Sequence, residues 1–379
     1  MPETGGYQSA SQMTSICKAQ FGEVNVSKVF LTMPKRSLGR IRSFLRLLKE
    51  EGAQYAEGFF YPSTNDLKYI FWYFGMKFFN FWGLCKVEKL LRKADFIVVT
   101  GFLEKSIIDQ IRSRANKAEF VFNHAGDPVT YNSKIKADNL RLVWDGYLDY
   151  MRNFSKVLFQ SELQMKLAKE IGLDSIRCCK LFPTCNEEII KDQLHGAINP
   201  FESGFCNIVN IGTLQERKNQ ELILDLAENL CHLPYRFYLI GDQKVDINYT
   251  LKLKKKIIEK NLDNVYLLGH RSDYILYVNY CDIVMNVSKF EGVSRVLRES
   301  LYLSKILICT KILGNMECVE DGSNGFLCGF NVNELIDKII MIRNMPAKEK
   351  TEFELRSKLI YENKYSLDRY KYNVYMLFS

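Results

Sequence analysis

The stretch "CNIVNIGTLQERKNQELILDLAENL", residues 206–230, predicts a strand, a polar loop and a helix. Residues 206–212 form an apolar run of strand length, and apolar residues recur at helical spacing over residues 219–230. The loop between them carries Arg217 and Lys218 directly before the predicted helix. Cations beside the free amides of a helix N-terminus suit a diphosphate, although a solvated basic loop alone would explain them as well.

The same alternation of strand and helix runs through the C-terminal half of the chain. Further strands are predicted at residues 235–241, 264–269, 282–288 and 306–310, with helices at 250–262, 273–281, 292–303 and 331–343. The N-terminal half repeats the pattern less cleanly, with strands at residues 27–32, 95–100, 118–124 and 156–161. Strands that alternate with long helices favour parallel, doubly wound sheets. The predicted fold class is therefore α/β, with two Rossmann-like domains facing a cleft at the carboxyl ends of their strands.

Domain boundaries follow from this rhythm and from the length of 379 residues, which suits two domains. We predict a first domain over residues 1–185, a second over residues 205–355 and a terminal helix over residues 356–379. The segment of mixed polarity between the domains, residues 185–205, contains Pro, Gly and Ser and is predicted to be a linker.

Composition indicates a globular protein, since 47% of the residues are hydrophobic and 25% are charged. The net charge is +8, and residues 1–100 hold 14 basic against 8 acidic residues, so most of the excess lies there. Most of the eleven cysteines stand singly in apolar runs, which is typical of a reducing compartment. The start of the chain lacks a signal-peptide pattern, and "CCKLFPTC" lacks histidine partners. We therefore expect a cytoplasmic location and no metal site.

A second polar motif, "SKFEGVSRVLRESL", follows the predicted strand at residues 282–288. Glu291 and Gly292 open the predicted helix there, and the amides of Val293 and Ser294 would be free in its first turn. Glu299 follows about 12 Å further along such a helix, so the two carboxylates could hold two parts of one elongated ligand. Taken alone, the pair would favour a simpler interpretation, in which Glu291 is an acid stabilised at a helix N-terminus and Glu299 is a surface residue.

Four segments together resemble the donor-binding domain of family 4 retaining glycosyltransferases, which belong to glycosyl transferases group 1 and have the GT-B fold. They are "IGTLQERKNQE", "VYLLGHRSD", "CDIVMNVSKFEGVSRVLRESL" and "ILGNMECVEDGSNGFLC", within residues 205–345. Weaker likeness extends over "ETGGYQSASQ", "FVFNHAGD" and "SKVLFQSELQMKLAKEIGL". The last segment, "YSLDRYKYNVYMLF", is similar to the terminal helix that crosses back to the first domain in that fold.

This resemblance implies transfer of a sugar from a UDP- or GDP-linked donor to a hydroxyl acceptor, with retention and without metal or other cofactor. It implies that Lys218, together with Arg217, stabilises the departing diphosphate, and that Glu299 binds the ribose hydroxyls. It places Glu291 near the transferred sugar as a catalytic residue. The remaining residues that it implies are His124 at the floor of the cleft and, in donor binding, Gly5, Gly6, Gly292, Val293 and Ser294.

Two departures from the family pattern keep alternatives open. Thr213 follows Gly212 where the family often has an arginine, so Arg217 is expected to supply that charge. Only four residues precede Gly5, where the family has a first strand, so that strand is predicted to be missing. The alternatives are a catalytically silent relative that acts as a membrane-associated assembly subunit, and a nucleotide-sugar epimerase of similar fold.

The N-terminal half is expected to choose the acceptor, a glycan or a lipid-linked sugar in assembly of a cell-surface polysaccharide, lipopolysaccharide or glycolipid. The segment "PKRSLGRIRSFLRLLKEE" predicts an amphipathic helix with a basic stripe of Lys35, Arg42, Arg46 and Lys49. An aromatic run, Tyr69 to Cys85, follows it. Together they suit peripheral contact with the inner face of an anionic membrane, and equally a domain core beside a solvated helix face. We predict no nucleic-acid partner, because no binding module is recognised.

Overall fold

The computed structural model describes residues 147–379 without a gap, together with shorter stretches of the N-terminal part. These stretches are residues 13, 16–17, 19–20, 29–32, 54–57, 88–89, 91–100, 105–115 and 117–124. Three predicted features lie outside the described residues: the Gly5–Gly6 segment, the aromatic run Tyr69 to Cys85, and the basic stripe of Lys35, Arg42, Arg46 and Lys49.

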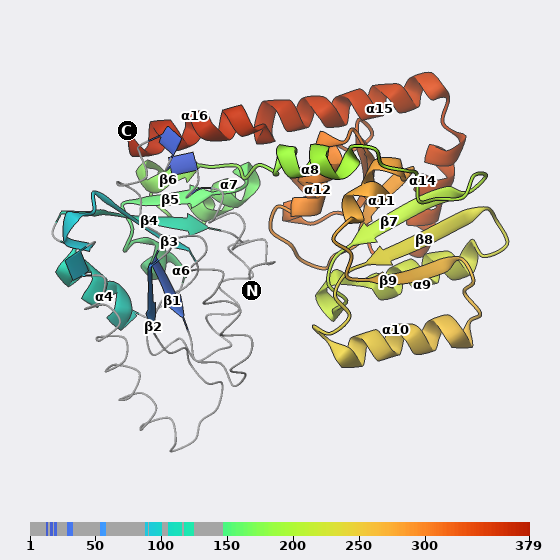
Figure 1. The fold of residues 1–379 in the computed structure, drawn as a ribbon, viewed down its shortest axis with the longest axis horizontal. Coiled ribbons are helices and arrows are strands. Elements are labelled where there is room, and N and C mark those ends of the chain that lie inside the picture. The colour runs from blue at the N-terminus through green and yellow to red at the C-terminus, as the bar shows by residue number, and fades with distance from the viewer. Residues whose placement is uncertain are drawn as a thin grey trace, which may run out of the picture. The chain divides into compact units, whose positions relative to one another are not determined.

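The chain divides into two compact units, which are drawn in Figure 1. The first unit comprises residues 1–160, 164–181 and 371–379. The second unit comprises residues 161–163 and 182–370. Each unit is built on a parallel sheet, as the alternating sequence pattern predicted.

The second unit contains a six-stranded parallel sheet with the order β12-β11-β10-β7-β8-β9. The strands are β7 (Cys206–Ile211), β8 (Tyr235–Ile240), β9 (Val265–Gly269), β10 (Ile283–Asn286), β11 (Ile306–Thr310) and β12 (Gly325–Cys328). The chain runs outward from β7 to β9 and then returns to place β10 on the other side of β7. The strand order therefore reverses between β7 and β10, which in parallel sheets is the usual place for a ligand.

Helices cover both faces of this sheet because successive strand residues point to opposite sides. Ile208 belongs to the core beneath α9 (Gln220–Asn229), α10 (Ile247–Glu259) and α14 (Val332–Asn344). Its neighbour Val209 belongs to the opposite core, which is formed with α8 (Glu187–Leu194), α11 (Tyr274–Tyr280) and α12 (Arg295–Tyr302). The short helix α13 (Leu313–Met316) follows β11. Burial on both faces explains why the strands read as continuous apolar runs.

The C-terminal segment consists of three consecutive helices. They are α15 (Ala347–Ile360), the π-helix η5 (Tyr361–Tyr365) and α16 (Leu367–Phe378). Residues 371–379 belong to the first unit, where Lys156 Nζ donates to the Leu377 carbonyl at 3.2 Å and Phe378 packs against Phe96. The predicted terminal helix is thus present, although position 356 lies inside α15 rather than at a boundary.

The first unit contains a four-stranded parallel sheet with the sequential order β3-β4-β5-β6. Its strands are β3 (Phe96–Thr100), β4 (Glu119–His124), β5 (Lys156–Phe159) and β6 (Cys178–Lys180). Its helices are α4 (Lys105–Arg114), α6 (Tyr147–Met151), α7 (Glu162–Glu170) and the 3₁₀ turn η3 (Ser175–Arg177). A separate parallel pair is formed by β1 (Val29–Thr32) and β2 (Gln54–Glu57). None of the helices that the structure describes has both the length and the apolar character needed to cross a membrane.

Two local predictions are wrong. The predicted linker, residues 185–205, contains α8, in which Ile190 is buried in the second unit and Asn186 caps the first turn by accepting from the Ile189 amide. The mixed polarity of this segment is that of an amphipathic helix. The chain passes from the first unit to the second at residues 181–182, before the predicted linker. The helix predicted to open at Glu291 begins at Arg295, because residues 291–294 form a loop with a bend at residues 292–293 that ends at the N-cap Ser294.

Candidate functional site

The loops that follow β7 and β10 meet at the point where the strand order reverses. Val209 and Val284 are paired across the two strands, and the Asn210 side-chain amide donates to the Met285 carbonyl at 2.8 Å. Beyond the strand ends, the Lys289 amide donates to the Arg217 carbonyl at 2.8 Å. The sheet therefore joins two motifs that lie more than 70 residues apart in the sequence.

Arg217, Lys218 and Glu291 form an ion cluster between these loops. Arg217 Nη1 lies 2.5 Å from Glu291 Oε2, and Lys218 Nζ lies 2.6 Å from Glu291 Oε1. The side chains of Lys218 and Glu291 are only 12% and 13% exposed, whereas that of Arg217 is 35% exposed. Burial lowers the pKa of Lys218, and the Glu291 carboxylate opposes that shift. One carboxylate thus partners two cations in a largely desolvated position.

Local backbone geometry positions the two cations. They lie in a 3₁₀ turn, η4 (Glu216–Lys218), which ends at Asn219 in a left-handed conformation with φ 56°. Asparagine tolerates that conformation better than most residues. The turn directs Lys218 across Gly212, where an added Cβ would lie 3.4 Å from the lysine Cε.

Two glycines that sequence reasoning missed hold these loops in place. A Cβ on Gly241, directly after β8, would lie 1.9 Å from the Gly212 carbonyl oxygen. A Cβ on Gly314, in α13, would lie 2.0 Å from the Gly292 carbonyl oxygen. Any side chain at either position would displace a loop of the ion cluster. The sequence signal was the position of each glycine at or shortly after the end of a predicted strand, but the close backbone approaches are visible only in the fold.

Glu299 is not a surface residue but is 5% exposed on α12. The Tyr274 hydroxyl of α11 lies 2.9 Å from both carboxylate oxygens, and Arg295 Nε lies 3.6 Å from one of them. Burial raises the pKa of Glu299, while Arg295 and the Tyr274 hydrogen bond oppose the shift. The structure therefore supplies Glu299 with two partners, Tyr274 and Arg295, that the motif did not reveal.

The other predicted donor residues precede α12. Gly292 contacts Gly314 through its carbonyl, while Val293 and Ser294 are 8% and 7% exposed. Thr213, which replaces the family arginine, accepts hydrogen bonds from Gln215 and Gln220 of the same loop region. Arg217, proposed to supply the missing charge, does lie beside Lys218 at the cluster.

His124 lies in the first unit, at the carboxyl end of β4. It is fully buried, and its ring centroid lies 5.0 Å from that of Phe159 and 6.0 Å from that of Phe122. Burial lowers the pKa of His124 to about 3, so the imidazole is neutral at physiological pH.

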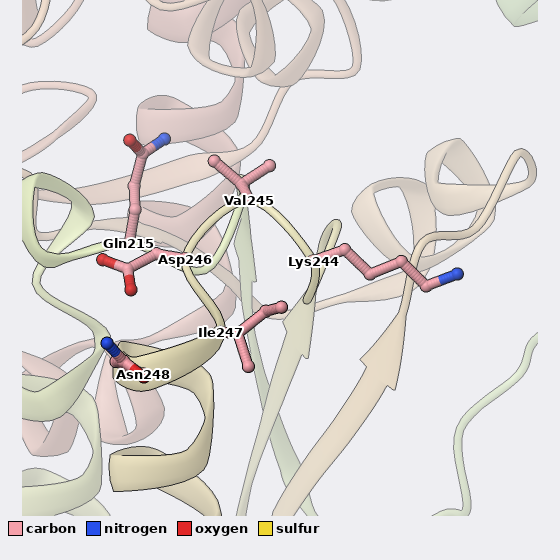
Figure 2. Close-up of a pocket in the computed structure, with 6 residues that line it drawn as sticks. All are labelled: Gln215, Lys244, Val245, Asp246, Ile247 and Asn248. Atoms are coloured by element: carbon pink, nitrogen blue, oxygen red, sulfur yellow. The ribbon is translucent and has the colours of Figure 1, made fainter. Parts of the chain in front are cut away.

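A cavity of about 560 Å³ lies beside the same β7 loop (Figure 2). It is lined by Gln215 and by residues 244–248, which precede and open α10. Figure 2 shows the Lys244 side chain extending away from Gln215 and Asp246. Asp246 caps α10 by accepting from the Tyr249 amide at 3.0 Å. A second cavity, of about 490 Å³, is lined by Asn219, Glu221, Leu222, Asp225, Lys289 and Phe330.

Sequence comparison places the ion cluster within a known family segment. Residues 197–364 match the family model described as Glycosyl transferases group 1. An uncharacterized glycosyltransferase of Methanocaldococcus jannaschii is 29% identical over 144 residues, which cover 37% of this chain. The same match spans 39% of the length of that curated relative.

Solved structures resemble the whole chain in fold. The crystal structure of Anabaena HepE with UDP and glucose is 17% identical, with a TM-score of 0.71, and the alignment covers 100% of this chain and 96% of that one. Sucrose-phosphate synthase of Thermosynechococcus elongatus is 14% identical with a TM-score of 0.73, and 99% and 93% are covered. These comparisons confirm the resemblance to group 1 glycosyltransferases and the GT-B fold predicted from the sequence.

Proposed function

We propose that this chain is a retaining, metal-independent family 4 glycosyltransferase that moves a sugar from a nucleoside-diphosphate donor to a hydroxyl acceptor. The observation that carries the proposal is the ion cluster of Arg217, Lys218 and Glu291, which lies at the strand-order reversal of the family-matched segment. Ligands of parallel sheets bind at such reversals. Two convergent cations there suit a diphosphate better than a neutral ligand.

Donor binding would exchange one anion for another. Glu291 now pairs with both cations and balances one of their two charges, and a diphosphate would take its place as their partner. When the bond between the anomeric carbon and the diphosphate breaks, negative charge grows on the departing oxygens, and Arg217 and Lys218 would stabilise it. The acceptor hydroxyl forms the new bond to that carbon and passes its proton to the departing diphosphate oxygen, which takes the electron pair of the broken bond. The released Glu291 carboxylate is then available to the sugar.

Glu299 is proposed to bind the ribose. Its two oxygens can each accept from a hydroxyl, and Tyr274 and Arg295 hold the carboxylate in one orientation. Each carboxylate oxygen keeps acceptor capacity beyond its bond to Tyr274, which suits a ligand that offers two neighbouring hydroxyl donors. The family likeness assigns the same role to this glutamate.

We propose the nucleotide base and the sugar of the donor only as classes. The solved Anabaena relative was crystallised with UDP and glucose, which makes a UDP-linked sugar the first donor to test and a GDP-linked sugar the second. His124, Gly5 and Gly6 are proposed to contribute to donor binding or catalysis from the first unit. The acceptor is proposed to be a glycan or a lipid-linked sugar used in cell-surface polysaccharide or glycolipid assembly. We also propose a cytoplasmic location, with the Lys35 to Lys49 stripe contacting the inner face of the membrane.

A panel of nucleotide sugars tests the proposal directly. The thermal unfolding temperature of the full chain should rise when one UDP- or GDP-linked sugar is added, and also with the matching nucleoside diphosphate. The rise should persist in EDTA. NMR of the glycoside formed with an acceptor should show the anomeric configuration of the donor. A product of opposite configuration would refute retention, and epimerised donor without an acceptor would favour the epimerase. No shift with any donor would favour the silent relative.

A further inference from the structure

Helix α10 presents an apolar ridge on its outermost face. Ile247, Leu251 and Ile258 are 61%, 59% and 74% exposed, and Val245, just before the helix, is 53% exposed. Positions 247, 251 and 258 are four and seven residues apart, so all three lie on one face of the helix. Scattered exposed leucines and isoleucines are ordinary on protein surfaces, but an aligned row is not.

The packing of α10 does not require this ridge. Tyr249 and Leu253 on the inward face are buried in the core of the second unit. Along one side, Lys252, Lys256 and Lys260 pair with Glu221, Asp225 and Glu228 at 2.7, 2.5 and 2.8 Å. Among the described residues, the core and these three ion pairs attach the helix through its other faces. The apolar ridge is therefore left for another contact.

Lysines flank the ridge on both sides. Lys254 and Lys255 are exposed neighbours of Leu251 and Ile258 in the helical wheel, and Lys244 lies at the start of the loop that carries Val245. The nearest acid on this face, Glu259, lies 3.5 Å from Lys255 and balances only that one charge. An aliphatic row with lysines on either side is typical of helices that lie in a membrane interface, because lysine stems extend along apolar surface while their ammonium groups remain in water.

The composition of the ridge favours lipid over protein. Protein interfaces are enriched in aromatic residues and arginine and depleted in lysine, whereas this face offers valine, isoleucine, leucine and lysine. We propose that the ridge of Val245, Ile247, Leu251 and Ile258, with Lys254 and Lys255, docks on an anionic lipid surface. This contact would lie in the second unit, and it does not depend on the glycosyltransferase proposal.

Vesicle co-sedimentation of the full chain tests the ridge. Phosphatidylcholine vesicles are compared with vesicles that also contain phosphatidylglycerol, at low and high salt. The variant I247S/L251S/I258S should bind anionic vesicles at least about tenfold more weakly, because the apolar contact is lost. The variant K254Q/K255Q should bind anionic vesicles about tenfold or more weakly and show a smaller salt dependence, since each lysine near such a surface contributes roughly fivefold.

Matched controls remove similar groups elsewhere in the second unit. I198S/L355S/L359S changes three exposed aliphatic residues, and K311Q/K348Q removes two exposed lysines; both should bind as the unchanged protein does. Circular dichroism and thermal unfolding verify that each variant is folded. Unchanged lipid binding by the ridge variant would overturn the proposal, as would an equal loss in the matched aliphatic control. A dimer in solution that the ridge variant abolishes, with no lipid binding by the unchanged protein, would also overturn it and assign the ridge to self-association.

Discussion

The two units use the same parallel βα architecture but treat the ends of their strands differently. In the first unit the described four-stranded sheet runs in sequential order, and β4 ends in His124, a neutral imidazole buried between phenyl rings. In the second unit the order reverses between β7 and β10, and three charged side chains meet beyond the strand ends. The difference teaches that a strand end becomes a charged site where two loops from a reversal converge, and stays apolar where aromatic side chains of the same and the neighbouring strand pack against it, as Phe122 and Phe159 do against His124.

The largest effect is expected from the buried cation of the second unit. Lys218→Ala should lower turnover by about 100- to 1000-fold, because the charge it meets develops as the donor bond breaks. Binding of the free nucleoside, which lacks phosphate, should remain unchanged. Steady-state kinetics and calorimetry measure the two quantities, with Lys252→Ala, which breaks an ion pair between α10 and α9, as control. Equal losses in nucleoside and diphosphate affinity would contradict the phosphate role.

Removing the buried Glu299 carboxylate should have the second-largest effect. Glu299→Ala should weaken binding of the nucleoside diphosphate by about 10- to 150-fold, the cost of a lost charged hydrogen bond. Glu259→Ala, which removes an exposed carboxylate on α10, should leave that affinity unchanged. Calorimetry decides the point, and an unchanged affinity in Glu299→Ala would remove the proposed ribose contact.

Removing the Glu291 carboxylate should affect diphosphate binding in the opposite direction. Glu291→Gln removes the anion that now partners Arg217 and Lys218, so diphosphate affinity should stay equal or rise. Turnover should nevertheless fall by about 10- to 150-fold, because a charged contact to the reacting sugar is lost. A fall in diphosphate affinity with normal turnover would show that Glu291 has no such catalytic contact.

Burial of the neutral His124 imidazole should make the first unit less stable in acid. The folded pKa of His124 is about 3 and its ordinary value is 6.5, so the unfolded chain binds one more proton between these values. Stability is therefore complete above pH 6.5 and falls as pH decreases, by about 2 kcal/mol at pH 5. His124→Gln should remove that part of the slope, and the exposed control His195→Gln should retain it.

Urea unfolding at pH 7 and pH 5, followed by far-UV circular dichroism, measures this transition and gives the free energy of unfolding at each pH. Identical pH slopes in the unchanged protein and in His124→Gln would contradict the buried, neutral state of the imidazole.

The smallest effect concerns the partner of Glu299. Tyr274→Phe removes the hydroxyl that orients the Glu299 carboxylate but leaves the carboxylate in place, so diphosphate binding should weaken by only about two- to tenfold. Tyr280→Phe is a matched control on the same helix, because its hydroxyl bonds to the Ala197 carbonyl at 2.9 Å. The two variants should differ in diphosphate affinity, measured by calorimetry, and equal affinities would show that Tyr274 does not position Glu299.

Much of the second unit could be predicted from the sequence because its signals are local. Strands such as Cys206–Ile211 are buried on both faces and read as short apolar runs, and helices such as Gln220–Asn229 repeat apolar residues at their own period. Boundaries were less accurate: an amphipathic segment at residues 185–205 was interpreted as a linker, and α12 was placed too early. The first error came from an amphipathic helix whose local polarity resembles that of a loop, and the second from Glu291, which is held by ion pairs that the local pattern does not encode.

The sequence by itself determined the α/β class, the family resemblance and the identity of Lys218, Glu291 and Glu299 as candidate site residues, because each depends on spacing within one segment. Only the tertiary structure decided which groups partner them. Glu291 meets its two cations across 73 and 74 residues of chain, and Glu299 meets Tyr274 across 25. These contacts form because the strand order reverses between β7 and β10 and because α11 packs beside α12. Burial at the contacts then shifts the pKa values of Lys218 and Glu299.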